Sequence, residues 1–410
     1  MENKESKFGM SSIPVTIWLL AVVSFFSNSA SVVISALAPE FVINVLGSTP
    51  AALGYIRGLS EALSYFVKLF SGVFSDWLGK RKILILIGYL CAALAKPMFA
   101  LSRGLGLYVL TQILERITNG LRDTPRDALI ADCAPKGLKG ESYGIRQAFA
   151  YIGSMVGAIV CYYILSGCYG NSSDKIRLVY FIAAIPIFIS VLLIYFFIKE
   201  PKIDSLKSRK GFPIKKTDIT QLSLKFWYYM AVCFVFMCAR YSETFLILRA
   251  RDLGLPLAQA PLVLALMYLF NAPTSKIIGS WSDKRDRRVF LVFGFCMMVT
   301  SCIVLSLATQ TWHAMIGAAI YGIHYGATQG TFYAMVADYS PPQLKGTSIG
   351  IFNLVCGIGM AISNLVAGEL WVHGSNIVFF INASISLLAV IGIMFVRPHD
   401  YNKEKIAEVK

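Results

Sequence analysis

Twelve apolar stretches, each close to twenty residues long, constrain the fold of this chain more than any other feature. About 20 apolar residues are enough to cross a bilayer as a helix, because the backbone polar groups then find partners within the segment. No stretch alternates between apolar and polar residues as the strands of a membrane barrel do. The sequence therefore predicts an all-α membrane protein with twelve transmembrane helices. These lie at residues 14–38, 51–75, 82–101, 106–129, 141–165, 177–198, 226–250, 258–281, 288–308, 312–336, 346–370 and 375–396.

Charge placement indicates the same class and an orientation. Only 15% of the residues are charged, against about 25% in soluble domains. The net charge of +15 would suit nucleic acid, but the basic residues gather in alternate loops, with Arg177, Arg249 and Arg251 among the exceptions. Such a bias is typical of loops that stay in the cytoplasm. We therefore expect a multi-pass protein of a bacterial inner membrane with both termini cytoplasmic and no nucleic-acid partner.

The predicted helices divide into six and six around a basic segment, which carries eight Lys or Arg residues against three acidic ones. Its prolines and its charge are typical of a solvated linker. We therefore expect an N-terminal six-helix lobe at residues 1–198, a cytoplasmic basic linker at 199–225 and a C-terminal six-helix lobe at 226–410.

The two halves repeat each other in sequence. SGVFSDWLGKRK (71–82) aligns with IGSWSDKRDRRV (278–289) at a spacing of 207, and ALIADCAPKGLKGESYGI (128–145) aligns with AMVADYSPPQLKGTSIGI (334–351) at a spacing of 206. A repeat of six helices is typical of two-lobed transporters, whose solute site lies between the lobes near the middle of the membrane.

Charged residues within the predicted helices mark the candidate site. An ionised group at the bilayer centre costs at least about 2.5–3.5 kcal/mol, so such groups face a protein interior or a water-filled cavity. The predicted fourth helix carries six of them within thirteen residues, and Asp123 and Arg126 are i, i+3 neighbours that can pair. Pro125 lacks an N–H and should bend this helix. The alternative interpretation is a self-neutralising cluster that only holds helices together.

The predicted residues of the substrate and proton pathway come from four helices. They are Arg57 and Glu61 on the second, Arg116, Asn119, Arg122, Asp123, Arg126 and Asp127 on the fourth, Arg240 and Glu243 on the seventh, and His324, Tyr325 and Gln329 on the tenth. At the spacing of 206, Gln329 takes the place of Asp123, so charge in the first half faces neutral polar surface in the second. Basic residues outnumber acidic ones, which predicts an organic solute with at least one negative group. An amphiphilic drug-like cation is the alternative.

Asp123 is the predicted proton carrier. It lies near the middle of its helix, beside the bend expected at Pro125, and a carboxylate there can bind and release a proton as nearby arginines change partners. Glu61 and Glu243 are the alternatives, and so is a permanent Asp123–Arg126 ion pair that never titrates.

A pattern of Gly-x-x-x-Asp followed by basic residues recurs where the second and eighth helices end. A carboxylate there can accept charge-assisted bonds from Arg or from a helix N-terminus, and lose them when the lobes separate. The alignment places Lys80 on Arg287 and Arg81 on Arg288. The predicted gating residues are Gly72, Asp76, Lys80, Arg81, Gly279, Asp283, Arg287 and Arg288.

These motifs resemble those of a known family. GVFSDWLGKRKI (72–83) is similar to the loop between helices two and three of the major facilitator superfamily, and RITNG (116–120) to its fourth-helix motif, with Asn119 in place of a glutamine. The resemblance covers essentially the whole chain and points to a bacterial branch of unassigned substrate. It implies a secondary active transporter that works by rocking of its two lobes.

The sequence lacks the motifs that are typical of other classes of membrane protein. No P-loop is present, which argues against an ATP-driven pump and leaves an ion gradient or facilitated diffusion. The four histidines are dispersed, and no C-x-x-C pattern is present. We therefore expect no enzyme, metal or cofactor, although a non-transporting receptor with this fold stays open. The expected partners are a small-molecule solute, protons and the lipid bilayer, and the expected state is a monomer. Gly144, Gly153 and Gly157 should form a small-residue packing face on the fifth helix.

Overall fold

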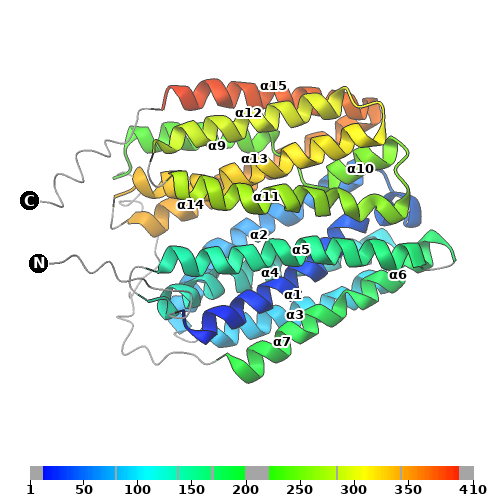
Figure 1. Cartoon of the computed structure of the whole chain (residues 1–410), viewed down its shortest axis with the longest axis horizontal. Coiled ribbons are helices and arrows are strands. Elements are labelled where there is room, and N and C mark those ends of the chain that lie inside the picture. The colour runs from blue at the N-terminus through cyan, green and yellow to red at the C-terminus, as the bar shows by residue number, and fades with distance from the viewer. Residues whose placement is uncertain are drawn as a thin grey trace, which may run out of the picture.

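The computed structural model describes residues 13–78, 81–135, 138–167, 170–198, 221–282, 285–341 and 344–396, and within these ranges the chain is a bundle of helices without strands (Figure 1). Nine helical segments of this described part are long and apolar enough to cross a membrane. Three further long helices carry too many charged or polar side chains to belong to that set: α2 (Pro50–Leu78), α4 (Leu105–Cys133) and α13 (Thr311–Asp338). These three line the cavity described below.

The order of the helices confirms the twelve predicted spans. The first group of six spans, here called the N-group, contains α1 (Val15–Glu40), α2, α3 (Arg81–Leu101), α4, α5 (Lys139–Gly167), and α6 (Ser172–Ile182) continued by α7 (Ala184–Phe197). The second, the C-group, contains α9 (Leu224–Ala239) continued by α10 (Thr244–Asp252), α11 (Ala260–Ser282), α12 (Arg287–Ser306), α13, α14 (Lys345–Leu370) and α15 (Ser375–Met394). Short helical turns follow α1 (η2, Phe41–Val45), precede α11 (η3, Leu257–Gln259) and follow α14 (η5, Trp371–His373).

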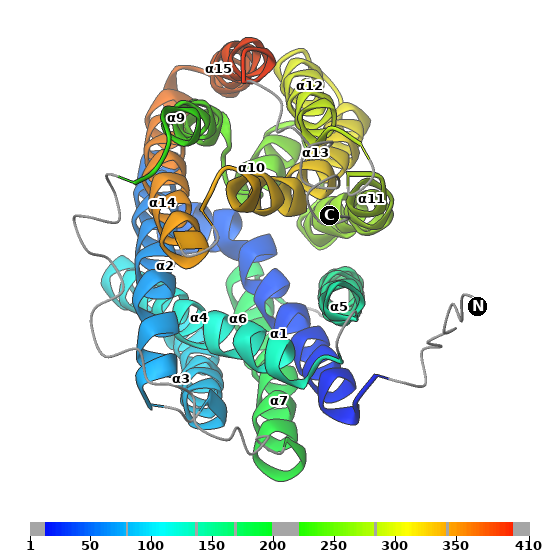
Figure 2. The ribbon, with the colours of Figure 1, turned by 90° about the vertical axis from the view of Figure 1, so that its left-hand side faces the viewer.

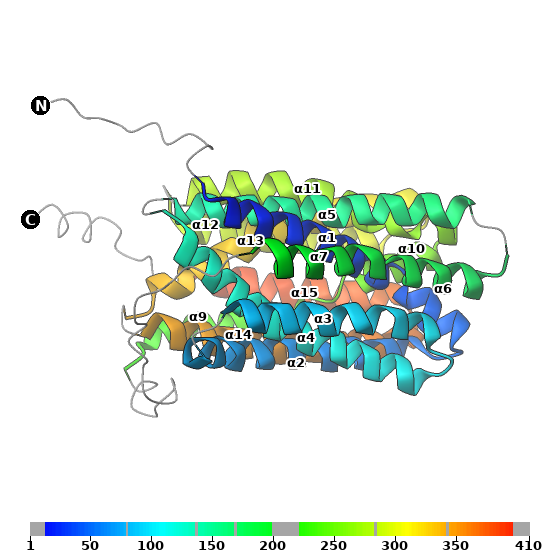
Figure 3. The same ribbon diagram turned by 90° about the horizontal axis from the view of Figure 1, so that it is seen from below.

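The first and last described helices begin and end on the same side. Val15 of α1 and Met394 of α15 lie at one end of the bundle, here called the terminal end, and the loop between α1 and α2 lies at the opposite, far end (Figures 1 and 3). The predicted linker at 199–225 falls almost entirely outside the described residues.

Helix packing follows the sequence repeat. Within the N-group, α1 packs on α5 and α7, and α4 packs on α2 and α3; within the C-group, α9 packs on α14 and α15, and α13 packs on α11 and α12. The main contacts between the groups are α2 with α14 and α5 with α11, as the end-on view shows (Figure 2). Because α2 corresponds to α11 and α5 to α14 in the repeat, the two joining contacts are equivalent.

Glycines bring the helices of each group into backbone contact. Gly153 and Gly157 of α5 leave no room for a side chain against Phe25 and Ser29 of α1, which confirms most of the predicted packing face. Gly144 faces open space and does not belong to it. Gly359, at the repeat position of Gly153, packs in the same way on α9. Small residues permit this approach in a membrane, where burial of apolar surface does not drive association.

Two equivalent ion pairs at the terminal end correct the alignment of the first motif. Arg81 lies 2.7 Å from Asp132, and Arg287 lies 2.6 Å from Asp338. Both partners are 206 apart, so Arg81 corresponds to Arg287 and the predicted match with Arg288 is wrong. The second loop is one residue shorter than the first, which explains the error.

Arg288, a predicted gating residue, makes contacts that differ from those of Arg81 and Arg287. Arg288 binds Asp286 at 2.5 Å and donates to the Val396 carbonyl at 2.7 Å, while the Asp286 carboxylate caps α12. A Cβ atom added at Gly279 would have no neighbouring atom within 4 Å. Of the remaining predicted gating residues, Lys80 and Asp283 lie outside the described residues, as do the surroundings of Gly72 and the side chain of Asp76.

Two predicted helices are interrupted, which the sequence interpretation did not foresee. The sixth span breaks at Ala183, where Pro186 lacks the N–H that would bind the Ile182 carbonyl. The seventh breaks between α9 and α10 at residues 240–243, although no Pro or Gly lies there. Side chains of neighbouring helices supply the missing hydrogen bonds of that segment.

In the 240–243 break, Asn364 Oδ1 accepts from the Ser242 N–H at 2.9 Å. The Tyr321 hydroxyl donates to the Tyr241 carbonyl at 2.7 Å. Irregular backbone at membrane depth is tolerated only where protein groups or a cavity satisfy it, and here α13 and α14 do so.

The basic residues that depart from the loop charge bias have structural partners at the far end. Arg249 donates to the carbonyls of Leu305 and Ala308, at 3.0 and 2.8 Å, at the C-terminal end of α12. Arg177 donates to the Ala100 carbonyl of α3 at 2.5 Å. Cations at helix C-termini are favourable because the exposed carbonyls there carry partial negative charge.

Candidate functional site

A cavity of about 270 Å³ lies between the N-group and the C-group. Its wall contains residues of α1, α2, α4 and α5 on one side, and of the 240–243 break, α11, α13 and α14 on the other. The predicted pathway residues that line it are Arg57, Glu61, Arg116, Asn119, Arg122, Asp123, Arg126, Arg240, Glu243, Tyr325 and Gln329.

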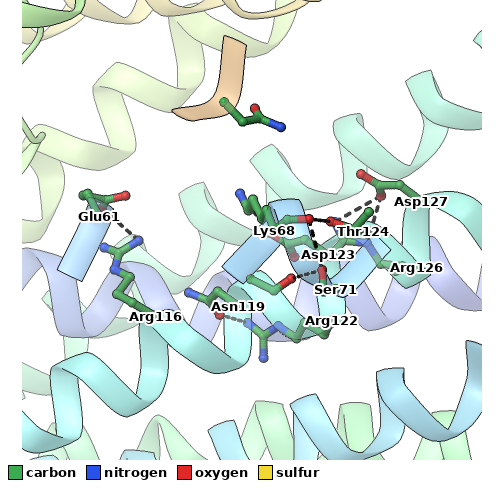
Figure 4. Close-up of polar contacts among 12 residues, drawn as sticks. Glu61, Lys68, Ser71, Arg116, Asn119, Arg122, Asp123, Thr124, Arg126 and Asp127 are labelled. Carbon is green, nitrogen blue, oxygen red and sulfur yellow. Dashed lines mark hydrogen bonds and ion pairs between the residues drawn. The ribbon is translucent and has the colours of Figure 1, made fainter. Parts of the chain in front are cut away.

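Asp123 lies at the centre of an ionic network on the N-group wall (Figure 4). Its carboxylate is 3.1 Å from Arg126, which confirms the predicted pair, and 3.3 Å from Lys68 of α2. Arg126 also binds Asp127 at 3.2 Å, and Arg146 of α5 lies 3.8 Å from the same carboxylate. This network therefore ties α2, α4 and α5 together with three cations and two carboxylates.

Two simpler ion pairs complete the N-group wall. Arg116 lies 2.9 Å from Glu61, so α4 and α2 are joined there as well (Figure 4). Lys96 of α3 lies 2.5 Å from Glu115 of α4, and its ammonium also donates to Ser31 of α1 at 3.3 Å. The Lys96 side chain is fully buried. Each pair holds helices of the same group together.

Arg57 has no such partner. Its side chain is buried, with 1% of the residue exposed, and Nε and Nη2 have no hydrogen-bond partner. No ion pair reaches it from the described part of the chain, although it lines the cavity. A buried cation without a partner is strongly unfavourable, so this guanidinium is suited to bind an anion in the cavity.

Two further guanidinium groups donate hydrogen bonds only to neutral side chains within the described ranges, and each keeps at least one buried nitrogen atom without a partner. Arg122 donates to Asn119 Oδ1 at 2.5 Å (Figure 4). Arg240, in the 240–243 break, donates to Gln329 Oε1 at 3.2 and 3.3 Å and stacks 4.3 Å from the Tyr325 ring centre. Neither forms an ion pair with a carboxylate within the described ranges, so both can offer hydrogen-bond donors to an anion in the cavity.

Glu243 is the corresponding carboxylate without a partner. It is half-buried at the start of α10 and lines the cavity, and its side chain makes no hydrogen bond or ion pair with any described residue. It lies within electrostatic range of Arg116 on the opposite group.

The wall as a whole carries an excess of positive charge. Seven cationic side chains and four carboxylates line the cavity, an excess of three. The cations are Arg57, Lys68, Arg116, Arg122, Arg126, Arg146 and Arg240, and the carboxylates are Glu61, Glu115, Asp123 and Glu243. The charge excess that the sequence predicted is therefore present in the cavity itself.

Two predicted pathway residues do not line the cavity. His324 is buried behind the wall of α13, with Nδ1 3.1 Å from the Gly294 carbonyl and its ring between those of Phe236 and Tyr321. Asp127 is not part of the cavity wall, but it binds Arg126, which is part of it, at 3.2 Å. Within the described ranges, no group of three His, Cys, Asp or Glu side chains is arranged to hold a metal ion.

The sequence interpretation missed one polar face. Asn28, Ser31 and Ser35 of α1 line the cavity at i, i+3 and i+7, and Tyr268 and Ser154 complete it from α11 and α5. The signal was present as isolated polar residues at helical spacing in an apolar helix. It was too weak to separate cavity residues from local serine hydrogen bonds to the backbone.

Comparison with known proteins identifies the family. The family model of the Major Facilitator Superfamily matches residues 17–364 and, in a second match, residues 244–410. An uncharacterised MFS-type transporter of Methanocaldococcus jannaschii is 28% identical over 387 residues, which cover 93% of this chain and 94% of that one. The lysosomal dipeptide transporter MFSD1 of Danio rerio is 26% identical over 206 residues, but these cover only 48% of this chain and 43% of that protein.

A solved structure shares the fold. A POT family transporter in complex with a thioalcohol-conjugated peptide superposes with a TM-score of 0.79 at 11% identity, covering 93% of this chain and 96% of that one. The match in sequence covers both halves of the chain, and the match in structure covers both six-helix groups. The chain therefore belongs to the Major Facilitator Superfamily and is a membrane transporter rather than an enzyme.

Proposed function

We propose that this chain is a proton-coupled secondary transporter of a small organic solute that carries at least one negative group. The observation that carries the proposal is the buried Arg57 guanidinium, which lines the cavity without an ionic partner. A solute carboxylate there would form charge-assisted hydrogen bonds and remove the cost of the isolated charge. Arg122 and Arg240, which have only neutral partners, support the same solute class.

Alternating access would follow from the two equivalent joining contacts. We propose that the lobes are residues 1–198 and 226–410 and that they rock about the α2–α14 and α5–α11 contacts. The loop charge bias supports a bacterial inner membrane with both termini and the linker at 199–225 in the cytoplasm. The terminal end of the bundle is then the cytoplasmic end, and the predicted monomer is sufficient because the cavity lies within one chain.

The proton path is proposed to start at Asp123. From this carboxylate the network continues through Arg126 to Asp127, which is more exposed and lies nearer the terminal end. Under this proposal, Asp123→Asn abolishes solute accumulation driven by a pH gradient but keeps downhill exchange. Loss of both activities would instead make the Asp123–Arg126 pair purely structural. Unchanged accumulation would move the proton site to Glu61 or Glu243.

The solute class is tested by binding to the purified protein. Organic acids and short peptides are offered beside their carboxamides, because the two differ only in the negative charge. The relatives named dipeptide transporters make N-acetyl-alanyl-alanine and its amide a sensible first pair. We expect thermal stabilisation by the acids only, with affinity falling at least about tenfold in Arg57→Gln and in Arg240→Gln. Arg103→Gln, which removes an exposed arginine between α3 and α4, is the matched control.

The alternative function is export of amphiphilic drug-like compounds. It would require a lipophilic cation to bind in preference to the acids. Selective stabilisation by tetraphenylphosphonium, or equal stabilisation by acids and amides, would overturn the anionic proposal.

A further inference from the structure

Two carboxylates of the cavity wall, Glu243 and Glu61, are here called the negative pole. Arg57 is here called the positive pole. Glu243 is the last residue of the 240–243 break, directly before α10, and its carboxylate lines the cavity without a hydrogen bond or ion pair to a described residue. The hydrogen bonds that Asn364 and Tyr321 make to the backbone of the break hold its position. An anionic solute has no use for this carboxylate, since like charges at close range repel.

Glu61 faces the same region from the opposite group. It binds Arg116 at 2.9 Å, and Glu243 lies within electrostatic range of that guanidinium. Both carboxylates also act electrostatically on the Tyr325 hydroxyl, which places them on one part of the cavity. Arg116 is ion-paired with Glu61, and Arg240 stacks on the same Tyr325, so Glu243 is the carboxylate of this pole that has no ion pair with a described residue.

Aromatic rings lie beside this pole. Tyr268 of α11 lies within electrostatic range of Glu243 and lines the cavity, as does Tyr325 of α13. The face of a tyrosine ring attracts an ammonium group, which adds to the attraction of a carboxylate. The Tyr325 face is already covered by Arg240 at 4.3 Å, so the Glu243 carboxylate and the Tyr268 ring are the groups suited to a further cation.

The positive pole lies one helical turn away. Arg57 precedes Glu61 by four residues on α2, so the two side chains leave the helix about 6 Å apart along its axis. Arg57 is 1% exposed and has unpartnered nitrogen atoms, which independently indicates a ligand at this site. The cavity therefore presents groups of opposite charge from positions about one helical turn apart on α2.

We propose that the solute is a zwitterion, with its ammonium group bound by Glu243 and Glu61 and its carboxylate bound by Arg57. The proposal rests on the proposed function and deepens it, because an anion alone would satisfy Arg57 but not Glu243. Under this proposal, Glu243 makes the protein prefer solutes with a free amine over solutes without one. A short peptide or an amino acid has the required charges.

Four forms of one dipeptide test this assignment. Binding to the purified full-length protein is measured for alanyl-alanine, for its N-acetyl form, for its C-terminal amide and for the doubly blocked form. We expect the free dipeptide to bind at least about tenfold more tightly than either singly blocked form. In Glu243→Gln this preference for the free amine disappears, while the N-acetyl form binds at least as tightly as it does to the wild type. That retained binding also shows that the variant is folded.

The control variants separate charge from structure. Glu243→Asp, which keeps the carboxylate, should keep the amine preference, and Glu141→Gln, which removes an exposed carboxylate at the terminal end, should change nothing. Equal binding of the free and N-acetyl dipeptides would overturn the zwitterion but leave the anionic transporter intact. Binding of none of the carboxylates would overturn both. An unchanged amine preference in Glu243→Gln would exclude Glu243 as the ammonium ligand.

Discussion

An ion pair at the far end gives the most direct test of rocking. Arg251 of α10 donates to Glu40 Oε2 of α1 at 3.1 and 2.8 Å, and it joins the C-group to the N-group. The side chains are 25% and 9% exposed, so the pair is screened only in part. Hydrogen bonds between charged groups contribute about 1.5–3 kcal/mol, and we take about 1.5 because the arginine is partly solvated. Glu40→Gln should therefore shift the population towards an open far end by about tenfold.

Distances between spin labels across the far end measure this shift. Labels on the exposed positions Thr49 and Pro256, in a background without reactive native cysteines, should show more of the long distance in Glu40→Gln in liposomes. The reversed pair, Glu40→Arg with Arg251→Glu, should return to within about twofold of the wild type. Asp174→Asn, which removes an exposed far-end carboxylate of α6, is the control. An unchanged distribution in Glu40→Gln, or a reversed pair that behaves as the single variant, would refute the role of this ion pair in closure.

Two further substitutions test packing and the buried charge. Gly54→Ala should also favour the open far end, because its methyl group would collide with the Asn364 backbone of α14; the same labels check this, and Gly144→Ala, which meets nothing within 4 Å, should have no effect. Lys96→Met should lower the free energy of unfolding by about 3–5 kcal/mol, because it isolates the buried Glu115 carboxylate. Thermal unfolding in detergent measures this loss. The double variant with Glu115→Gln should recover most of it, and equal stability of the single and double variants would argue against a paired charge.

The span positions and the repeat could be predicted because they depend on composition along the chain. A run of apolar residues determines that a helix crosses the membrane, whatever that helix packs against. The i, i+3 pair of Asp123 and Arg126 was predictable for the same reason, since both residues lie on one helix. Eleven of the thirteen predicted pathway residues line the cavity, because charge within an apolar helix has few other places to go.

Contacts between helices could not be derived in this way. Lys96 and Glu115 belong to different helices, and nothing in either pattern indicates that they meet. The break at 240–243 depends on side chains of α13 and α14 that lie 80 and 122 residues away in sequence. His324 looked like a cavity residue beside Tyr325, but one step around a helix turned it towards Phe236 instead. The spacing of residues along one helix shows which of them share a face, but the packing of the whole bundle decides which helix that face contacts.

The distribution of partners between the two groups leads to a condition on coupling. The cationic partners of Glu61, Glu115 and Asp123 all belong to the N-group, so rocking of rigid groups leaves these ion pairs unchanged. Glu243 and Arg240 belong to the C-group, and their separation from the N-group wall is what rocking alters. A ligand shifts a conformational equilibrium only by its difference in affinity for the two states. A solute held by Arg57 alone would bind both states almost equally, whereas one that also contacts Glu243 would bind most tightly when the groups approach each other around it. The charge that selects the solute would then also be the charge that drives closure.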